Sequence, residues 1–575
     1  MKYLEGQKPL PWETTMLCLC RTELYKGTAL AILVLAISCL PYALGYGFAP
    51  PEWDFSGFII NAEDSNTYLA AMQQGAQGAW RFRLLYTPED HPGAFLYLFY
   101  LLLGHLSALT GSPLILTYHL ARLFCGLALL MVAYFFIAFF IRRRAVRWIA
   151  YLLVCFSSGL GWLLLLIRPT PPGGISPIDF WLMDAYVFFT LFTLPHFCLA
   201  TAALLATFLA TLTYFRTPRL RYLLTGGLSV LVMAIVHPFA VLIVDAVLAV
   251  YWLFLWGIRR RWPGRETLGI AVIGLVPLPL LAYDYCALQS NSVFRAWQAQ
   301  NFTPSPPPGY YVLGYGLVLL LACPGAIHVL LRRDQRGLFL VVWAVVAAVL
   351  AYSPLLLQRR MVEGLHVPLC ILASLGLFRY VLPAVHRSRL ARWLASKVHY
   401  PRRRFRLLVL NLLLAATFPS NLFLLASAGL VAWQHQPPFF YLRAENAAID
   451  WLGAHTRWTD TVLAAFPVGN YIPARIGHRV FWGHWIETVD YEGKKQLAEA
   501  FFQAETDDAV RRELLQTWGI AYLFYGPQER ALGDFNPEDK PYLMKTFSNS
   551  RVSIYRVVIR HTQTGSFYSP VRWLA

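Results

Sequence analysis

Two adjacent acids, Glu63 and Asp64, stand near the start of NAEDSNTYLAAMQQG (residues 61–75), in a chain in which only 14% of residues are charged. At helical spacing, Asp64 and Tyr68 lie about one turn apart and face the same way. A carboxylate held beside a hydroxyl group can act as its general base, provided that the reacting groups are kept together there. A second interpretation stays open: Asp64 is the N-cap of a short helix, and the two acids only mark where the chain meets water.

Paired arginines in QRRMVEG (residues 358–364) suit a different role, the binding of phosphate. Arg359 and Arg360 carry permanent charge, and a guanidinium group can bind a phosphate or pyrophosphate through two parallel hydrogen bonds. The alternative is that both side chains simply extend from an apolar environment towards water.

Further acids and histidines stand next to apolar runs and are candidates for substrate contacts. His196 and His237 each adjoin a proline, so that packing or hydrogen bonding at a helix end is the other interpretation for them. Ionisable groups are costly at such positions, which makes a functional site the default hypothesis. The full set of these additional candidates is Asp90, His91, Asp184, His196, His237 and Glu363.

The elements that must position these residues are membrane-spanning helices. Hydrophobic residues make up 57% of the chain and aromatic residues 15%, and the mean hydropathy is +0.48. Apolar runs of about 20 residues, the length that crosses a bilayer as a helix, recur along the sequence. We therefore expect a polytopic α-helical membrane protein, located in the inner or plasma membrane.

The basic residues indicate how the chain is threaded through the membrane. They cluster in short gaps between apolar runs, which is typical of cytoplasmic loops, so the formal charge of +18 points to anionic lipid head groups and not to nucleic acid. This pattern predicts a cytoplasmic N-terminus, a first span retained as an anchor and not cleaved as a signal peptide, and a C-terminus outside. The eleven expected spans lie near residues 27–48, 114–141, 146–168, 195–215, 222–238, 239–258, 267–285, 310–331, 337–357, 365–385 and 407–433.

One further apolar segment, residues 93–111, does not fit this count, because a span there would invert all later loops. We expect it to be interfacial, re-entrant or only partly inserted, which leaves about 11–12 membrane helices in all. The basic segment 386–406, interleaved with Leu and Trp, is expected to lie on anionic lipid as an amphipathic helix. The four outer loops are then 49–92, 169–194, 286–309 and 358–364, and they bring the candidate residues to one face of the membrane.

The last part of the chain has a different character. Residues 1–433 form the membrane domain, and residues 434–575 are expected to form a small α/β domain outside the membrane. No cysteine follows Cys370, so this domain cannot contain a disulfide. Its expected elements are a helix at 444–455, one or two helices within 494–518, and strands at 461–467, 479–483, 521–526 and 552–558.

The sequence requires no cofactor. Cys18 and Cys20 form a CxC pair without further ligands nearby, and no Gly-rich phosphate loop of the P-loop or Rossmann kind is found. Because several acids share the outer face, a divalent metal is compatible with the site, but no ligand spacing demands one.

These motifs resemble a known family, the GT-C superfamily of glycosyltransferases that use polyprenyl-phosphate sugars, including protein O-mannosyltransferases and aminoarabinose transferases of lipid A. Its members have a first transmembrane helix followed by an Asp-Glu-x-x-Tyr-like motif on a juxtamembrane helix, which Asp64 and Tyr68 match, with Ser65 where many members carry Glu. Segments 87–111 and 358–377 are similar to the entry to the next helix and to a late Arg-then-Pro helix. The resemblance implies that Asp64 is the catalytic base and that the arginine pair binds the lipid phosphate.

The expected function is an inverting single displacement. Asp64 takes the proton of an acceptor hydroxyl, the anomeric carbon is attacked, and the polyprenyl phosphate leaves, stabilised by Arg359 or Arg360. The expected partners are a polyprenyl-phosphate-linked sugar, an acceptor glycan, lipid or protein, and membrane lipids. Two other classes stay open: a lipid or sugar transporter, for which Asp245 within a span is the main support, and a non-catalytic scaffold or binding protein of the same fold.

Overall fold

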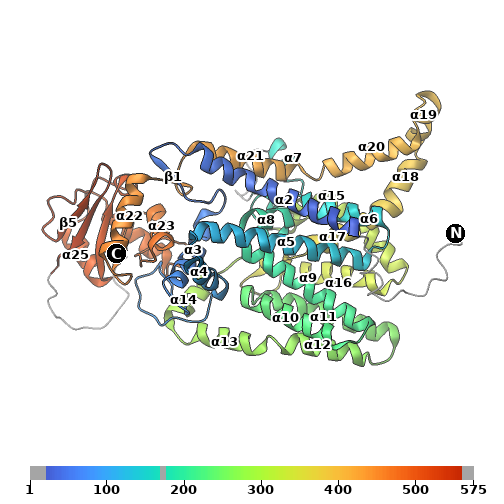
Figure 1. The fold of residues 1–575 in the computed structure, drawn as a ribbon, viewed down its shortest axis with the longest axis horizontal. Helices are drawn as coiled ribbons and strands as arrows, with labels where there is room; N and C mark the ends of the chain where they lie inside the picture. Colours follow the sequence, from blue (N-terminus) through green and yellow to red (C-terminus); the bar gives the residue numbers. More distant parts are fainter. Residues whose placement is uncertain (1–20, 169–175, 560–575) are drawn as a thin grey trace.

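The structure, a computed structural model, describes residues 21–168 and 176–559. It consists of a bundle of long helices with a smaller mixed α/β domain at one end (Figure 1). Cys18, Cys20 and the first seven residues of the predicted outer loop 169–194 lie outside the described residues.

Seven helical segments in the described part of the chain are long and apolar enough to cross a membrane. This confirms the predicted polytopic helical architecture. Two of these segments are composite. Residues 264–289 consist of α12 (Gly264–Leu275) and α13 (Leu278–Gln289), and residues 358–387 contain η4 (Gln358–Val362), α17 (His366–Gly376), η5 (Leu377–Val381) and α18 (Leu382–Arg387). The other five are α2 (Arg21–Phe48), α5 (Leu114–Phe140), α9 (Pro195–Arg216), α11 (Ala240–Arg259) and α15 (Pro308–Leu331).

Two more apolar segments are bent pairs of helices. The pair α6 (Arg144–Phe156) and α7 (Gly161–Ile167) is bent by 52°, and the pair α20 (Arg402–Ala415) and α21 (Pro419–Gln434) by 42°. The two breaks meet, because the backbone N–H of Ser158 and its hydroxyl group both donate to the Thr417 carbonyl, at 2.7 and 2.9 Å. Backbone groups released at a break within a membrane need such partners.

Two of the predicted spans are shorter than expected. The helix α10 (Leu220–Val236) has 17 residues and α16 (Gln335–Leu350) has 16. At 1.5 Å per residue each extends about 25 Å, slightly less than the hydrocarbon thickness of a typical bilayer. Every predicted span nevertheless coincides with one of the helices or bent pairs described here.

The helix in the ambiguous segment 93–111 is α4 (Leu98–Thr110), and its 13 residues extend about 20 Å, too little to cross. It packs closely on α3 (Ala62–Ala76), at the same end of the bundle as the α/β domain (Figure 1). Glycines allow this approach: a Cβ atom on Gly75 would lie 2.2 Å from the Leu101 carbonyl oxygen, and one on Gly104 would lie 2.0 Å from that of Met72. The short helix therefore serves as a support for α3.

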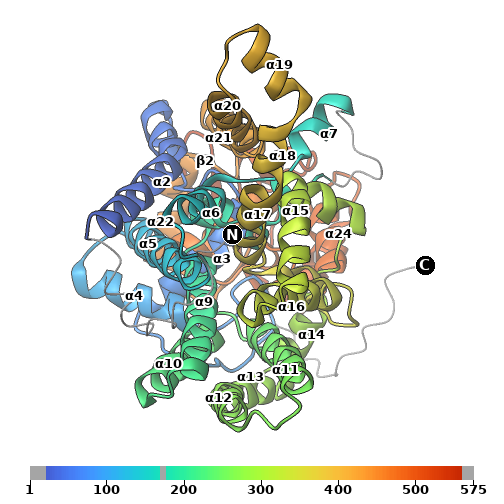
Figure 2. The ribbon, with the colours of Figure 1, turned by 90° about the vertical axis from the view of Figure 1, so that its right-hand side faces the viewer.

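The basic loops gather at the opposite end of the bundle. The guanidinium group of Arg216 lies over the ring of Phe139, and that of Arg143 over the ring of Phe378. The basic helix α19 (Arg389–Lys397) projects from the same end (Figure 1), and in the view along the bundle it stands above α20 and α21, opposite α10, α11 and α12 (Figure 2). This separation of the two ends agrees with the predicted topology, whose orientation in the membrane stays a prediction.

The α/β domain contains a four-stranded sheet in the order β3-β4-β6-β5. The first pair is parallel and the other two are antiparallel. The strands are β3 (Thr461–Leu463), β4 (Ile520–Tyr525), β5 (Leu543–Ser548) and β6 (Ser553–Val557), and the helices are α22 (Arg443–His455), α23 (Phe466–Ile476), α24 (Tyr491–Phe501), α25 (Asp508–Thr517) and the short α26 (Pro527–Arg530).

The predictions for this domain are confirmed in part. The helix at 444–455, the strands at 521–526 and 552–558, and two helices within 494–518 are present. The predicted strand 461–467 is wrong beyond Leu463, because α23 begins at Phe466, and the predicted strand 479–483 makes only a single bridge, between Val480 and Val462. The sheet instead uses β5, which was not predicted.

Two of the contacts that attach the domain to the bundle lie at the end that carries α3 and α4. Strand β1 (Trp53–Phe55), which follows α2, pairs in antiparallel fashion with β2 (Phe440–Leu442), which precedes α22. Helix α23 packs on α3, where the amide group of Asn66 donates to Asn470 at 2.7 Å. These contacts place the domain directly beside Asp64.

Candidate active site between the helical bundle and the C-terminal domain

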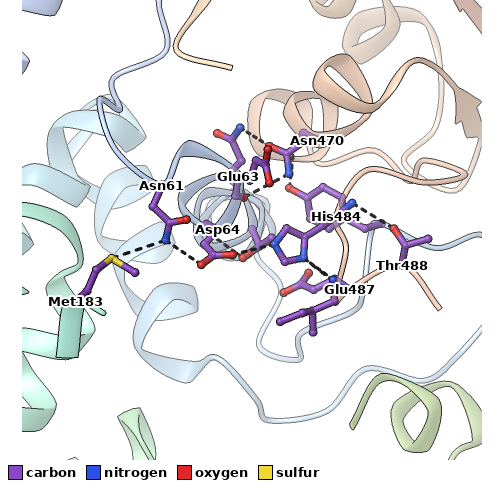
Figure 3. A network of polar contacts seen from close by, with 12 residues as sticks. Asn61, Glu63, Asp64, Met183, Asn470, His484, Glu487 and Thr488 are labelled. Carbon is purple, nitrogen blue, oxygen red and sulfur yellow. Dashed lines mark hydrogen bonds and ion pairs between the residues drawn. The ribbon is translucent and has the colours of Figure 1, made fainter. Parts of the chain in front are cut away.

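Asp64 lies where α3 meets the C-terminal domain, with a separate donor for each of its carboxylate oxygens. Oδ2 accepts a hydrogen bond from the amide of Asn61 at 2.8 Å, and Oδ1 accepts one from Nε2 of His484 at 3.0 Å (Figure 3). The His484 side chain is 4% exposed, whereas that of Asp64 is 25% exposed. The carboxylate is therefore held in a fixed orientation and can still be reached by a second molecule.

The alternative interpretation of Asp64 as a helix N-cap is wrong. Asn61 occupies the N-cap position, with the left-handed backbone angles φ 52° and ψ 46°, and Asp64 is the third residue of α3. The side chain of Asn61 makes no capping bond and donates to Asp64 instead. Asn tolerates this backbone region better than most residues.

A tight turn fixes the protonation site of His484. Its Nδ1 accepts hydrogen bonds from the backbone N–H groups of Ile486 and Glu487, at 3.3 and 3.2 Å. The Thr488 hydroxyl accepts the backbone N–H groups of Gly483 and His484, both at 3.2 Å, which closes the turn. Because Nδ1 is an acceptor, the hydrogen-bond pattern assigns the ring proton to Nε2, which donates it to Asp64.

The surroundings of Asp64 favour its ionised form. Burial acts to raise the pKa of Asp64, but the hydrogen bond and charge of His484, the hydrogen bond of Asn61 and the positive charge of Arg360 together hold this pKa below its ordinary value. Asp64 is thus a carboxylate at neutral pH. Each of its oxygens retains a lone pair that is free to accept a proton or a further hydrogen bond.

Two other acids lie close to this group. Burial raises the pKa of Glu487 to about 7, and its Oε1 accepts the hydroxyl of Tyr97 at 3.3 Å. Burial also raises the pKa of Glu63, and the negative charge of Asp64 acts in the same direction. Of the three acids, Asp64 is the one whose pKa lies below its ordinary value.

A cavity of about 640 Å³ lies beside this group, at the end of the bundle that carries α4. Tyr68, one turn after Asp64, lines it, and its ring stacks on that of Tyr100 with 4.6 Å between centroids. Most of the wall is apolar and comes from α4 and the residues just before it, from α10, α11 and α13, and from the segment before η4 (Gln358–Val362). It includes Leu96, Leu98, Ile235, Leu242, Leu280 and Leu355.

The two candidate arginines are in different positions. Arg360 lines the cavity, and its Nη1 donates to Oδ2 of the buried Asp184 at 3.2 Å. Its guanidinium group also lies over the ring of Phe197, 5.1 Å from the centroid. Arg359 does not line the cavity, and its guanidinium group lies over the ring of Trp181. The structure thus brings together Arg360, Asp184 and the Asp64 group. The charges of Asp184 and Asp64 also act on Arg359, but its guanidinium group lies on Trp181 and not in the cavity wall.

The candidate histidines lie at the wall of the same cavity. Both His196 and His237 line it, with 5.0 Å between their ring centroids. The buried Glu363 accepts Nδ1 of His237 at 2.9 Å and the Thr201 hydroxyl at 3.3 Å. Glu363 therefore fixes the ring of His237 and is not itself part of the wall.

The remaining two candidates lie away from the cavity. Asp90 forms an ion pair of 2.7 Å with Arg479 of the C-terminal domain. His91 accepts the backbone N–H of Leu84 at 2.9 Å through Nε2, and its Nδ1 lies 2.9 Å from the carbonyl oxygen of Glu89. Neither lines the cavity: Asp90 joins the loop 49–92 to the domain, and His91 stabilises that loop internally.

Sequence reasoning missed the contributions of Asn61, His484 and Glu487. The available signal was the spacing of His484 and Glu487 within GHWIET (residues 483–488), in a segment otherwise rich in aromatic residues. That His484 meets Asp64, 420 positions away, follows only from the docking of the domain. Among the described residues, no group of three or more His, Cys, Asp or Glu side chains is placed to hold a metal ion.

No family model matches the sequence, and no curated protein matches it. Among solved structures, ArnT from Cupriavidus metallidurans, bound to undecaprenyl phosphate, is similar with a TM-score of 0.49 and 13% identity, over 92% of this chain and 98% of that one. The oligosaccharyltransferase of Archaeoglobus fulgidus in its apo form is similar with a TM-score of 0.48 and 13% identity, over 86% and 69%. The mycobacterial arabinofuranosyltransferase AftD is similar with a TM-score of 0.45 and 16% identity, over 92% and 42%.

All three of these neighbours are glycosyltransferases of the GT-C superfamily. The sequence motifs around Asp64 and Arg360 resemble the same superfamily. Similarity at these identities and TM-scores carries no information about substrate or mechanism. The function proposed below therefore rests on the residues of the site.

The raised pKa of Glu487 predicts a pH-dependent stability. Burial raises the pKa of Glu487 from about 4.5 to about 7. Between pH 4.5 and pH 7, therefore, Glu487 keeps its proton in the folded protein and has lost it in the unfolded chain. The free energy of unfolding must then fall as the pH rises through this window. Glu487→Gln lacks this pH-dependent loss. The apparent unfolding temperature of the variant minus that of the wild type, measured in detergent, should therefore increase between about pH 5 and pH 8. The exposed Glu513→Gln should show no such gain; an equal response of both variants would contradict the assignment.

Proposed function

We propose that the protein is an integral membrane glycosyltransferase that moves a sugar from a polyprenyl-phosphate donor to an acceptor hydroxyl on the outer face of the membrane, with Asp64 as the general base. One observation carries this proposal. An ionised carboxylate, oriented by two hydrogen bonds, precedes by one turn a tyrosine that lines the same apolar cavity as Arg360. A base and a permanent positive charge thus flank a space that suits a lipid.

The cavity supports a polyprenyl-phosphate donor. Its apolar wall from α4, α10 and α13 can bury isoprenoid units, each methylene group contributing about 0.8 kcal/mol. Arg360 is the permanent charge in this wall. Asp184 holds Arg360 in place, and the Arg360 side chain is still 21% exposed. A guanidinium group so placed can bind the phosphate through two hydrogen bonds.

The acceptor has separate access to Asp64. The carboxylate lies next to the cavity without forming part of its wall, and a quarter of its side chain is exposed. An acceptor, whether glycan, lipid or protein, can therefore reach the base while the lipid occupies the cavity.

The reaction is a single displacement with inversion at the anomeric carbon. The acceptor oxygen attacks this carbon and forms the new glycosidic bond, while the bond to the phosphate oxygen breaks and its electron pair leaves with the polyprenyl phosphate. Arg360 compensates the charge that grows on the leaving phosphate. Asp64 accepts the hydroxyl proton, and because its pKa is low, this transfer proceeds late, as the attacking oxygen becomes acidic.

His484 acts in this scheme as a positioning residue. Its Nε2–H and the amide of Asn61 hold the two carboxylate oxygens of Asp64, so that the remaining lone pairs have a fixed direction. A carboxylate free to rotate would lose part of the advantage of orientation.

Asp64→Asn should reduce sugar transfer by about 10²–10⁴-fold, since the amide keeps the shape of the side chain but cannot accept the proton. The measurement is the transfer of labelled sugar from a panel of polyprenyl-phosphate sugars in membranes containing the full chain. Asp450→Asn, which removes an exposed acid on α22 that pairs with Arg475, is the matched control and should retain activity. Wild-type rates in Asp64→Asn would rule out the proposed base.

Variants of His484 separate orientation from stability. His484→Ala should lower kcat by about tenfold or more and move the acidic limit of activity to higher pH, because the lost hydrogen bond lets the pKa of Asp64 rise. His484→Gln, whose amide can still donate to Oδ1, should recover most of the rate and the original pH limit. If both variants lose activity equally, with unchanged pH profiles, His484 supports only the fold.

Arg360→Ala should weaken the binding of undecaprenyl phosphate by about 10–100-fold, as expected for a hydrogen bond to a charged group. Native mass spectrometry of the purified full chain, titrated with undecaprenyl phosphate, measures this affinity. Arg360→Lys keeps the charge without the fork and should lie between wild type and Arg360→Ala. Arg359→Ala, with its guanidinium group on Trp181, should change the affinity by less than about threefold; the reverse order of the two arginines would contradict the assignment of the phosphate site.

A further inference from the structure

A second cavity, of about 270 Å³, lies at the opposite end of the bundle from Asp64, among the basic loops. Its wall is formed by the C-terminal ends of α5, α9 and α11, by α12, and by the start of α16. Arginines from three of these elements face it: Arg216, Arg259 and Arg336. The wall also includes apolar side chains such as Leu212 and Leu255, so the cavity is apolar on one side and cationic on the other.

One of the three arginines is neutralised by a carboxylate. Nη1 of Arg259 forms an ion pair of 2.6 Å with Oε1 of Glu266, whose side chain is 7% exposed. The second acid of the wall, Asp334, is engaged at the start of α16, where it accepts the backbone N–H of Arg336 at 3.1 Å. Neither Glu266 nor Asp334 therefore joins Arg216 to Arg336.

The other two arginines have no such partner. Within residues 21–168 and 176–559, neither Arg216 nor Arg336 forms an ion pair, although the charge of Asp334 acts on Arg336. The guanidinium group of Arg216 lies over the ring of Phe139, 5.4 Å from its centroid. The charges of Arg216 and Arg336 act on each other, and that of Arg142 acts on both. Like charges gathered in a partly buried site repel one another unless an anion joins them.

We propose that this cavity binds a phosphate group between Arg216 and Arg336. A phosphate offers several acceptor oxygens, which suit two guanidinium groups on neighbouring helices better than a single carboxylate does. The cavity, of about 270 Å³, is about nine times the volume of about 30 Å³ that one water takes up in the liquid, which is room for a phosphate and an attached glycerol. The ligand class is thus a phosphate ester, either the head group of an anionic lipid or a free phosphorylated small molecule.

The cavity lies where the head group of a membrane lipid could reach it. Arg216 ends α9 and Arg259 ends α11, two of the helices long and apolar enough to span the membrane. Lipid head groups lie at this level of a bilayer, and basic pockets between membrane helices suit anionic ones. The bound phosphate would tie the end of α9 to the start of α16. This site is independent of the glycosyl transfer proposed above.

The test uses the full chain in neutral phosphatidylcholine nanodiscs, with phosphatidylglycerol, glycerol phosphate or inorganic phosphate added in separate arms. Thermal unfolding and native mass spectrometry measure stabilisation and bound lipid. Phosphatidylglycerol should stabilise the wild type, and Arg216→Gln/Arg336→Gln should lower its affinity by about tenfold or more. Equal protection by glycerol phosphate would identify a soluble ligand, and protection by phosphatidylglycerol alone would identify a lipid.

Arg332→Gln/Arg333→Gln is the matched control, because it removes the same charge from two exposed residues of the neighbouring loop that do not line the cavity. The control should bind phosphatidylglycerol as the wild type does. Equal losses in both double variants, or no binding of any phosphate ester to the wild type, would overturn the proposal. If the glutamine variant does not fold, Arg216→Lys/Arg336→Lys replaces it: retained charge without the guanidinium forks should give an intermediate affinity, and unchanged affinity would refute the two-arginine site.

Discussion

The hydrogen bond from Nε2 of His484 to Oδ1 of Asp64, 3.0 Å long, connects the helical bundle to the C-terminal domain at the candidate active site. This hydrogen bond depends on two independent features of the fold. The Ile486 and Glu487 backbone N–H groups direct the ring proton towards Asp64, and the packing of α23 on α3 brings the ring within reach. Because burial alone would raise the pKa of Asp64, this bond also contributes to keeping the carboxylate ionised. Orientation and charge of the candidate base therefore depend on the same contact.

The helical architecture could be predicted from the sequence because hydropathy and the placement of arginines are local properties. Each expected span coincides with a helix or a bent pair, and the doubtful segment 93–111 contains the short α4. The breaks in the two bent pairs were not predicted; Ser158 and Thr417, which meet there, are distant in sequence. In the C-terminal domain, the apolar stretch that begins at Thr461 has β-like composition, but Pro467 stands at the start of α23 and favours a helix there.

Only part of the candidate site could be predicted from the sequence: the residues that are close together in the chain, and those that stand at the ends of apolar runs. The spacing of Asp64 and Tyr68 predicts their shared face on α3, and the cavity does collect Arg360, His196 and His237. Sequence could not distinguish Arg360 from Arg359, since adjacent residues point in different directions and only packing decides which one meets the cavity. Nor could it find His484, because no pattern near residue 484 refers to residue 64.

The arrangement gives the C-terminal domain a role beyond attachment. A domain that only anchored the loop 49–92 could rest on the β1–β2 pair and on ion pairs such as Arg479 with Asp90. Here it also supplies His484 to Asp64 and Glu487 to Tyr97, and Tyr97 lines the lipid-sized cavity. We infer that displacement of the domain would remove a donor from the candidate base and disturb the cavity wall together. A docked domain is then a condition for an oriented and ionised Asp64.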